Sequence, residues 1–190
     1  IIPIGSGLGG GSSNAAAVLR ALNKLWKINF SPNKLEKLGA ELGADIPFFI
    51  RGGFQLAEGV GEKLTPQNNQ ILHGLHFLLI IPSVRISTPD AYRSLNKPLL
   101  PVENPSKFAP VSEPVNWQLF DNDFEKVFRK TYPEIGNIKE GLQGAGALYA
   151  SLSGSGSTVF GVFDNLKTAE LTREVFSHYQ TFLTSPVFHS

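Results

Sequence analysis

The chain has 190 residues, and its 42% hydrophobic fraction is enough for the core of one large domain or two small ones. The formal net charge is only +1, with 17 basic and 16 acidic residues, and no apolar run is long enough to cross a bilayer, so neither nucleic acid nor a membrane is an expected partner. The absence of cysteine excludes disulfides and a thiol nucleophile, which is compatible with a cytoplasmic enzyme, and the spacing of the four His residues gives no ligand pair, so we assign no metal-ligating residue.

The most informative stretch lies near the start, where an apolar run at 1–4 leads into a glycine turn. Five of the nine residues from Gly5 to Ser13 are glycine, and an alanine-rich helix is predicted directly after them. Glycines let the backbone approach a ligand, and a helix N-terminus presents free N–H groups to an anion. Ser12, Ser13 and Asn14 can cap this helix or donate to phosphate oxygens. A flexible linker or a simple capped helix is the alternative, but the helix that follows at once favours a phosphate loop.

The type of phosphate loop is narrowed by what surrounds the glycines. A Walker loop is not predicted, because no Lys follows the last glycine. Gly5, Gly7 and Gly10 fit the dinucleotide fingerprint of a Rossmann oxidoreductase. Two observations count against that fold. Pro3 cannot donate to the ladder of a central parallel strand, and residues 29–33, where an acidic residue is expected, contain none.

Two helices are predicted after the loop. The first spans 14–26, and its apolar stripe is expected to pack on a sheet. The second begins with Ser31 as cap and Pro32 at the first helical position, and ends at Gly43. The stripe of the first helix consists of Ala15, Val18, Leu19, Leu22, Leu25 and Trp26, and the inner face of the second of Leu35, Leu38 and Leu42.

Asp45 is a lone carboxylate between Ala44 and the apolar run 46–50, at a predicted junction between a helix and a strand. The simpler interpretation is a turn or cap residue, because Asp is common at such junctions. The other interpretation is a general base, because an acid flanked by apolar residues can be partly desolvated. The residues alone leave both open.

The middle of the chain predicts a hairpin at 54–64, with Glu58 and Glu62 solvated rather than metal-binding, and a buried strand at 76–82. Thr88 or Ser87 can cap a short helix that carries Tyr92. The stretch 95–113 holds four prolines and predicts a loop to which we assign no chemistry.

The last third predicts alternating helices and strands. Asn122 heads a helix that runs to about 132, and a second helix runs from Pro133 to about 144–146. Two apolar strands then flank a Ser-Gly-Ser-Gly-Ser turn at 153–157, which on its own indicates a hairpin. A helix at 164–179 and a strand at 181–187 complete the chain. This irregular alternation predicts an α+β fold rather than a doubly wound α/β fold.

Three of these stretches together resemble the GHMP small-molecule kinases. Residues 3–16 are similar to the family's ATP-binding motif, 43–49 to its Gly-Ala-Asp-Val-Pro motif, and 153–157 to its third, glycine-rich motif. The Gly-Gly-Gly-Ser-Ser-Asn-Ala-Ala wording is similar to the branch that phosphorylates a cytidine diphosphate ester of methylerythritol. The resemblance covers nearly all of the 190 residues.

The resemblance implies transfer of the ATP γ-phosphate, with Mg²⁺ bridging the phosphates, to the 2-hydroxyl of 4-diphosphocytidyl-2-C-methyl-D-erythritol, a step of non-mevalonate isoprenoid synthesis. It makes Asp45 the catalytic base and Tyr92 the aromatic that stacks on cytosine. Ser13 is our candidate for a contact near the metal ion. The implied ATP-binding residues are Pro3, Gly5, Ser6, Gly7, Leu8, Gly9, Gly10, Gly11, Ser12 and Ser13, and the implied substrate-binding residues are Thr88, Tyr92, Gly154, Ser155 and Gly156. Another GHMP kinase, acting on a sugar, homoserine or mevalonate, and a non-catalytic nucleotide-binding module are the alternatives.

The implied fold has two lobes, with residues 1–56 ending the ATP-binding lobe and residues 57–190 forming a substrate lobe that is ferredoxin-like in its last part. Because the chain contains no Met and opens inside an apparent strand, we expect it to be a fragment that lacks most of the N-terminal lobe. The family's first motif, with a Lys that partners the catalytic Asp, is absent. We therefore expect the missing N-terminal segment to be a partner besides the small-molecule substrate, and the fragment alone to be weakly active or inactive.

Overall fold

The computed structural model describes residues 2–95, 111 and 114–187, and these residues form two compact units. The first unit contains residues 2–8, 70–95 and 114–187, and the second contains residues 9–69 and 111. Most of the predicted loop at 95–113 lies outside the described residues. None of the described helices combines the length and the hydropathy that a bilayer crossing requires.

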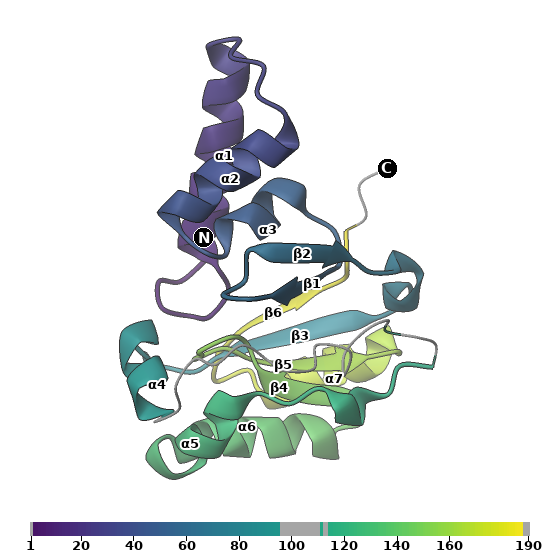
Figure 1. Cartoon of the computed structure of the whole chain (residues 1–190). Coiled ribbons are helices and arrows are strands. Elements are labelled where there is room, and N and C mark those ends of the chain that lie inside the picture. The colour runs from purple at the N-terminus through teal and green to yellow at the C-terminus, as the bar shows by residue number, and fades with distance from the viewer. Residues whose placement is uncertain (1, 96–110, 112–113, 188–190) are drawn as a thin grey trace. The chain divides into compact units, whose positions relative to one another are not determined.

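A four-stranded antiparallel sheet is the centre of the first unit (Figure 1). Strand β3 (His76–Ile81) pairs with β5 (Val159–Phe163) on one side and with β6 (Gln180–Thr184) on the other, and β4 (Tyr149–Leu152) pairs with β5. The strand order is β4-β5-β3-β6, with helices between β3 and β4 and between β5 and β6. This is the β-α-β-β-α-β arrangement of ferredoxin-like folds, so the predicted α+β class and the predicted ferredoxin-like part are confirmed.

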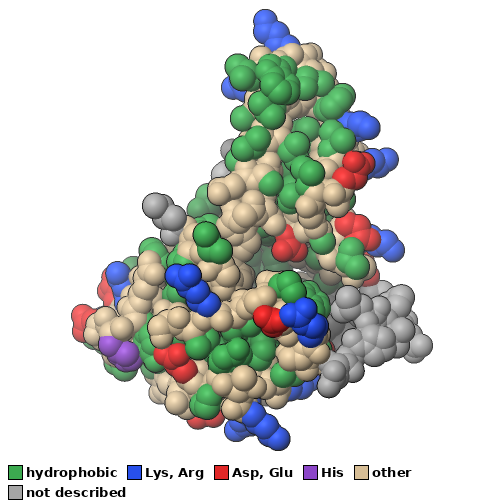
Figure 2. Space-filling view, turned by 90° about the vertical axis from the view of Figure 1, so that its left-hand side faces the viewer, with side chains coloured by type: hydrophobic (Ala, Val, Ile, Leu, Met, Phe, Trp, Pro, Cys, Tyr) green, Lys and Arg blue, Asp and Glu red, His purple; other side chains and the backbone are tan. Residues whose placement is uncertain are grey.

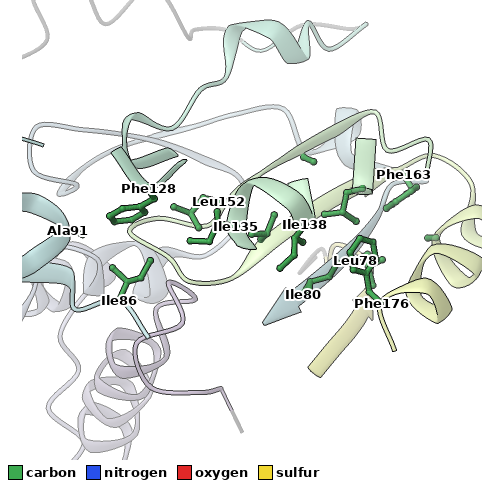
Figure 3. Close-up of a cluster of buried hydrophobic side chains, with 14 residues drawn as sticks. Leu78, Ile80, Ile86, Ala91, Phe128, Ile135, Ile138, Leu152, Phe163 and Phe176 are labelled. Carbon is green, nitrogen blue, oxygen red and sulfur yellow. The ribbon is translucent and has the colours of Figure 1, made fainter. Parts of the chain in front are cut away.

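One face of this sheet carries the core of the first unit (Figure 3). Leu78 and Ile80 alternate along β3 and are fully buried, because side chains two residues apart on a strand share a face. They pack against helices that follow β3 and β5, and each such burial stabilises the fold by roughly 1.5–3 kcal/mol. These helices are α4 (Thr88–Ser94), α5 (Asp123–Thr131), α6 (Pro133–Gly144) and α7 (Leu166–Val175), and their buried side chains include Ala91, Phe128, Ile135, Ile138, Leu142 and Ala169.

The second unit has three helices and a two-stranded hairpin. Helix α2 begins as predicted, with the Ser31 hydroxyl accepting from the Lys34 N–H and proline in the first turn. The hairpin is also confirmed, because Glu58 pairs with Lys63 across the glycine turn. The elements are α1 (Gly10–Leu25), α2 (Pro32–Leu42), α3 (Ile46–Arg51), β1 (Gln55–Glu58) and β2 (Lys63–Pro66), and the small core consists of Ala16, Leu35, Ile46 and Ile50.

Helix α1 differs from its prediction in two ways. It starts at Gly10 with Gly9 at the N-cap, so that Ser12, Ser13 and Asn14 lie inside its first turns and are not caps. It packs against α2 and α3 rather than on a sheet. The predicted apolar stripe is therefore only partly buried, and Val18, Leu25 and Trp26 remain 56–72% exposed. Figure 2 shows hydrophobic side chains on the surface at the top of the view, at the height where Figure 1 labels α1.

Two predicted strand assignments are wrong. The apolar run at 46–50 forms helix α3, so Asp45 lies between two helices and not at a junction with a strand. A short apolar run has no periodicity that separates a strand from a buried helix, and Pro47 lies in the first turn, where its missing N–H costs nothing. The described residues 2–4 also lie outside any strand.

Candidate functional site

The two glycine-rich loops predicted at opposite ends of the chain contact each other in the first unit. The Ser153 hydroxyl donates to the Gly7 carbonyl oxygen at 2.9 Å, across 146 positions of sequence. The Thr158 N–H donates to the Ser6 carbonyl oxygen at 3.1 Å. Ser6 is buried, and its hydroxyl donates to the Pro3 carbonyl oxygen at 2.8 Å. The structure therefore joins the start of the first loop to the stem of the second.

Glycine is required at Gly7 by this contact. Its φ is +74°, which disfavours any residue with a side chain. A Cβ atom there would overlap the Ser153 carbonyl oxygen and lie 2.8 Å from the Gly156 oxygen. Gly154 and Gly156 also have positive φ values, of 55° and 90°. The two backbones can thus approach each other only because the close positions have no side chains.

The rest of the first loop, Gly9–Ser13, belongs to the second unit and opens helix α1. Gly9 has a φ of 64°, and a Cβ atom on it would lie 2.6 Å from the Phe49 ring. Within the described residues no side chain caps α1, and there is no acidic residue in its first turn. The N–H groups of a first helical turn have no intrahelical acceptor. This turn, which includes Gly11 and Ser12, can therefore bind an anion.

Asp45 occupies the N-cap position of α3, and its side chain is exposed and makes no cap hydrogen bond. The same helix places Phe49 against Gly9, so the helix that begins after Asp45 also packs on the start of α1. The nearby hairpin approaches Asp45 closely, because a Cβ atom on Gly61 would lie 3.7 Å from Asp45 Oδ1. An exposed carboxylate that makes no cap hydrogen bond is available for chemistry.

The predicted substrate-binding residues lie together in the first unit. The Thr88 and Ser155 hydroxyls are 3.1 Å apart, which links the start of α4 to the second glycine loop. Tyr92, also on α4, is 48% exposed. Its ring meets the Phe124 ring edge to face, with centroids 5.1 Å apart. The exposed part of the Tyr92 ring can therefore contact another planar ring.

Sequence reasoning missed two residues that support the second glycine loop. Asn122 was expected to head α5, and it does cap this helix. In addition, the Asn122 side-chain amide donates to the Leu152 and Gly154 carbonyl oxygens at 2.9 and 2.8 Å. Glu125 Oε1 accepts from the Ser151 hydroxyl at 2.7 Å and from the Leu152 N–H at 2.8 Å. The available signal was the spacing of two polar residues, three apart, at a helix start.

The charges near these residues are mostly paired or solvated. The Arg93 guanidinium, and then the Ser87 hydroxyl, lower the pKa of Asp90 on α4. Hydrogen bonds from its own N–H and from the Val60 N–H lower the pKa of Glu62, whose exposed carboxylate thus caps backbone donors of the β1–β2 turn. No group of three or more His, Asp or Glu side chains that could hold a metal ion occurs within residues 2–95 and 114–187.

A cavity of about 380 Å³ lies beside the first loop in the first unit. Gly5, Ser6 and Ser157 line one side of it, and Arg85 and His178 are the basic side chains in its wall. It borders the backbone of the first glycine loop.

Known proteins match this arrangement along the whole chain. Residues 1–53 match the family model described as GHMP kinases N terminal domain, and residues 108–180 match GHMP kinases C terminal. A curated relative from Chloroherpeton thalassium, named 4-diphosphocytidyl-2-C-methyl-D-erythritol kinase, is 38% identical over 98% of this chain and 67% of its own length. The chain belongs to the GHMP kinase family. The suspected family is thereby confirmed.

Further GHMP kinase relatives agree. The protein of the same name from Thermodesulfovibrio yellowstonii is 40% identical, and this chain spans 65% of its length. A crystal structure of 4-(cytidine 5'-diphospho)-2C-methyl-D-erythritol kinase is 30% identical with a TM-score of 0.74, covering 96% of this chain and 66% of that one. A homoserine kinase from Cytophaga hutchinsonii shares the fold, with a TM-score of 0.77, 20% identity and coverage of 98% and 67%.

Proposed function

We propose that the protein carrying this chain transfers the γ-phosphate of ATP to the 2-hydroxyl of 4-diphosphocytidyl-2-C-methyl-D-erythritol. The observation that carries the proposal is the contact between the two glycine-serine loops at Ser6–Gly7 and Ser153–Thr158. Two loops of this kind, joined through their backbones, are a suitable cradle for phosphate groups. The names of the curated relatives at about 40% identity support the cytidine substrate.

The first loop and the start of α1 would bind the ATP phosphates. The loop contains no lysine, so the negative charge would be stabilised by backbone N–H groups and the positive end of the helix dipole. Residues Gly9–Ser13 supply that helix start. ATP supplies the phosphoryl group when bound, and the chain's contribution is to hold its phosphates in a fixed orientation.

Mg²⁺ would accompany the nucleotide and be held mainly by phosphate oxygens, as is usual for this ion. Such an ion needs one or two protein oxygens rather than a carboxylate cluster. Ser13 fits that role, because its hydroxyl uses its proton in a 3.1 Å bond to the Gly10 carbonyl and keeps its lone pairs free to ligate.

Asp45 would act as the general base that accepts or orients the proton of the attacking hydroxyl. Its side chain is exposed and has no cap hydrogen bond to lose. On the substrate side, Tyr92 would stack on the cytosine through its exposed face. Thr88, Gly154, Ser155 and Gly156 would surround the acceptor and its phosphates. In this proposal residues 1–56 belong to ATP binding and residues 57–190 to substrate binding.

The test combines binding with turnover. Calorimetry of ATP with Mg²⁺, and of the cytidine compound, is measured on the 190-residue chain, and acceptor-dependent ADP release is measured on the encoded protein. Homoserine and mevalonate serve as control acceptors. We expect the 190-residue chain to bind both ligands. We expect the encoded protein to release ADP from ATP when the cytidine compound is the acceptor, and not with homoserine or mevalonate. ADP release with a control acceptor instead would refute the proposed substrate. No ATP binding by the 190-residue chain together with no acceptor-dependent ADP release by the encoded protein would refute the kinase proposal.

A further inference from the structure

The first turn of α5 contacts two parts of the proposed substrate site at once. Asn122 at its N-cap reaches the second glycine loop, and the Phe124 ring packs against the Tyr92 ring at nearly a right angle. Glu125 binds the stem of the same loop at Ser151 and Leu152, and its second oxygen pairs with Lys139. One helical turn thus fixes the loop and the aromatic ring relative to each other.

Asn122 uses both ends of its amide. The Oδ1 atom accepts from the Phe124 N–H at 3.0 Å and so caps the helix. The Nδ2 atom donates to two carbonyl oxygens, of Leu152 and Gly154, which lie on the strand β4 side of the loop. An amide has an acceptor and two donors on one short side chain. Aspartate has no donor, and serine is too short to reach two carbonyls, although both are good N-caps.

The second glycine loop is held partly by its own residues, through the bond from the Gly156 N–H to the Ser153 carbonyl oxygen and the bond between the Ser155 and Thr88 hydroxyls. Gly154 and Gly156 carry no side chains and adopt positive φ values. Ser153 ties one side of the loop to Gly7. At the tip of the turn, the Asn122 side-chain amide donates a hydrogen bond to the Gly154 carbonyl oxygen. Without it, the Gly154 carbonyl would lose this bond, and the flexible glycine backbone at the tip could adopt more conformations.

We propose that Asn122 is a positioning residue: it holds the Ser153–Ser157 loop in the conformation that receives the phosphate acceptor. The role rests on the proposed function of this loop. A ligand that binds only one loop conformation has an apparent dissociation constant equal to its intrinsic value divided by the fraction of protein in that conformation. A looser loop lowers this fraction and therefore raises the apparent dissociation constant. A saturating acceptor restores that state, so kcat changes less than KM.

The variants are Asn122→Ser and Asn122→Asp, which keep the cap and remove the amide donor. The matched control is Asn165, the N-cap of α7, whose Oδ1 accepts from the Thr168 N–H at 3.0 Å. Within the described residues Asn165 makes no hydrogen bond to the glycine loop. Asn165→Ser and Asn165→Asp therefore make the same chemical changes at a helix cap without touching the loop.

Two measurements are made on each variant. Amide hydrogen exchange is followed without substrates at Gly156 and Thr158, whose N–H groups donate to Ser153 and Ser6. KM and kcat for the acceptor are measured on the encoded protein at saturating ATP. We expect the Asn122 variants to raise the acceptor KM about tenfold and to exchange at least about tenfold faster at these amides, with kcat within about twofold. The Asn165 variants should match the wild type in all three.

Each outcome decides a separate statement. Unchanged exchange in both Asn122 variants, or an equal rise in the Asn165 variants, refutes the loop-holding role. Faster exchange with an unchanged acceptor KM refutes the positioning of substrate. A lower kcat with unchanged KM and a lower melting temperature indicates a purely structural role and also refutes it. Failure of the proposed function is seen differently, as absence of acceptor-dependent turnover in the wild type, and the exchange experiment does not depend on it.

Discussion

Replacing Gly7 by alanine should destabilise the first unit strongly. The new Cβ would overlap the Ser153 carbonyl oxygen and lie 2.8 Å from the Gly156 oxygen, so one of the two loops must move. The left-handed backbone at φ +74° adds about 1–2 kcal/mol for a residue with a side chain. Overpacking adds about 1–3 kcal/mol. The sum of about 2–5 kcal/mol is a large part of a typical stability of about 5–15 kcal/mol.

Urea unfolding followed by tryptophan fluorescence measures this loss. The two tryptophans report on different units, Trp26 on the second and Trp117, stacked on Tyr149, on the first. A Trp26→Phe background isolates the first unit, and Trp26 is 64% exposed, so this change costs little. The control is Gly136→Ala in α6, where a Cβ meets nothing within 4 Å and should stabilise the helix by about 0.5–1 kcal/mol.

A Gly7→Ala variant whose free energy of unfolding lies within about 0.5 kcal/mol of the wild-type value would contradict the contact between the loops. Surface substitutions away from packed features have effects of that size. An equal loss in Gly136→Ala would show that the loss does not depend on the close contact at Gly7, and would likewise count against that contact. We expect opposite signs for the two variants.

Three further changes test other parts of the site. Asp45→Asn should lower kcat about 10²–10⁴-fold without weakening ATP binding or changing stability, since no cap hydrogen bond is lost; a protein with normal turnover would rule out the base. Tyr92→Ala should weaken cytidine binding by about 1–3 kcal/mol in calorimetry, whereas Tyr92→Phe should retain it; equal losses would exclude stacking. Glu125→Ala should lower the free energy of unfolding in urea by about 3 kcal/mol, because it leaves the Lys139 ammonium and two hydrogen-bond donors without their partner. Glu140→Ala, which breaks an exposed 3.9 Å pair, should cost about 0–1 kcal/mol, and a Glu125 effect no larger than this would contradict the supporting role of that carboxylate.

Much of the fold was accessible from local signals. Ser31 and Pro32 mark the start of α2, Asn122 marks α5, and the glycine turn at 59–61 marks the hairpin. These are determined by hydrogen bonds within a few residues, which is why the sequence alone predicts them. The resemblance to the GHMP kinases supplied the ferredoxin-like topology, which local signals do not determine.

The errors have a common physical cause. The apolar runs at 14–26 and 46–50 show that a segment is apolar but not what it packs against. Tertiary packing puts both in a small helical unit, where part of the first stripe remains exposed. The double use of Asn122 was missed for the same reason. Its cap is local, but its bonds to Leu152 and Gly154 span 30 and 32 positions.

The separation between Gly7 and its partner also has a consequence during synthesis. Ser153 is 146 positions further along the chain. Because ribosomes add about 5–20 residues per second, roughly 7–30 seconds pass between the synthesis of Gly7 and that of Ser153. Among the described residues, the second unit consists of residues 9–69 and Val111, and its helices and hairpin can form early because their contacts are local. A nascent chain arrested before Ser153 should therefore protect α1–α3 from proteolysis while its first glycine turn remains accessible.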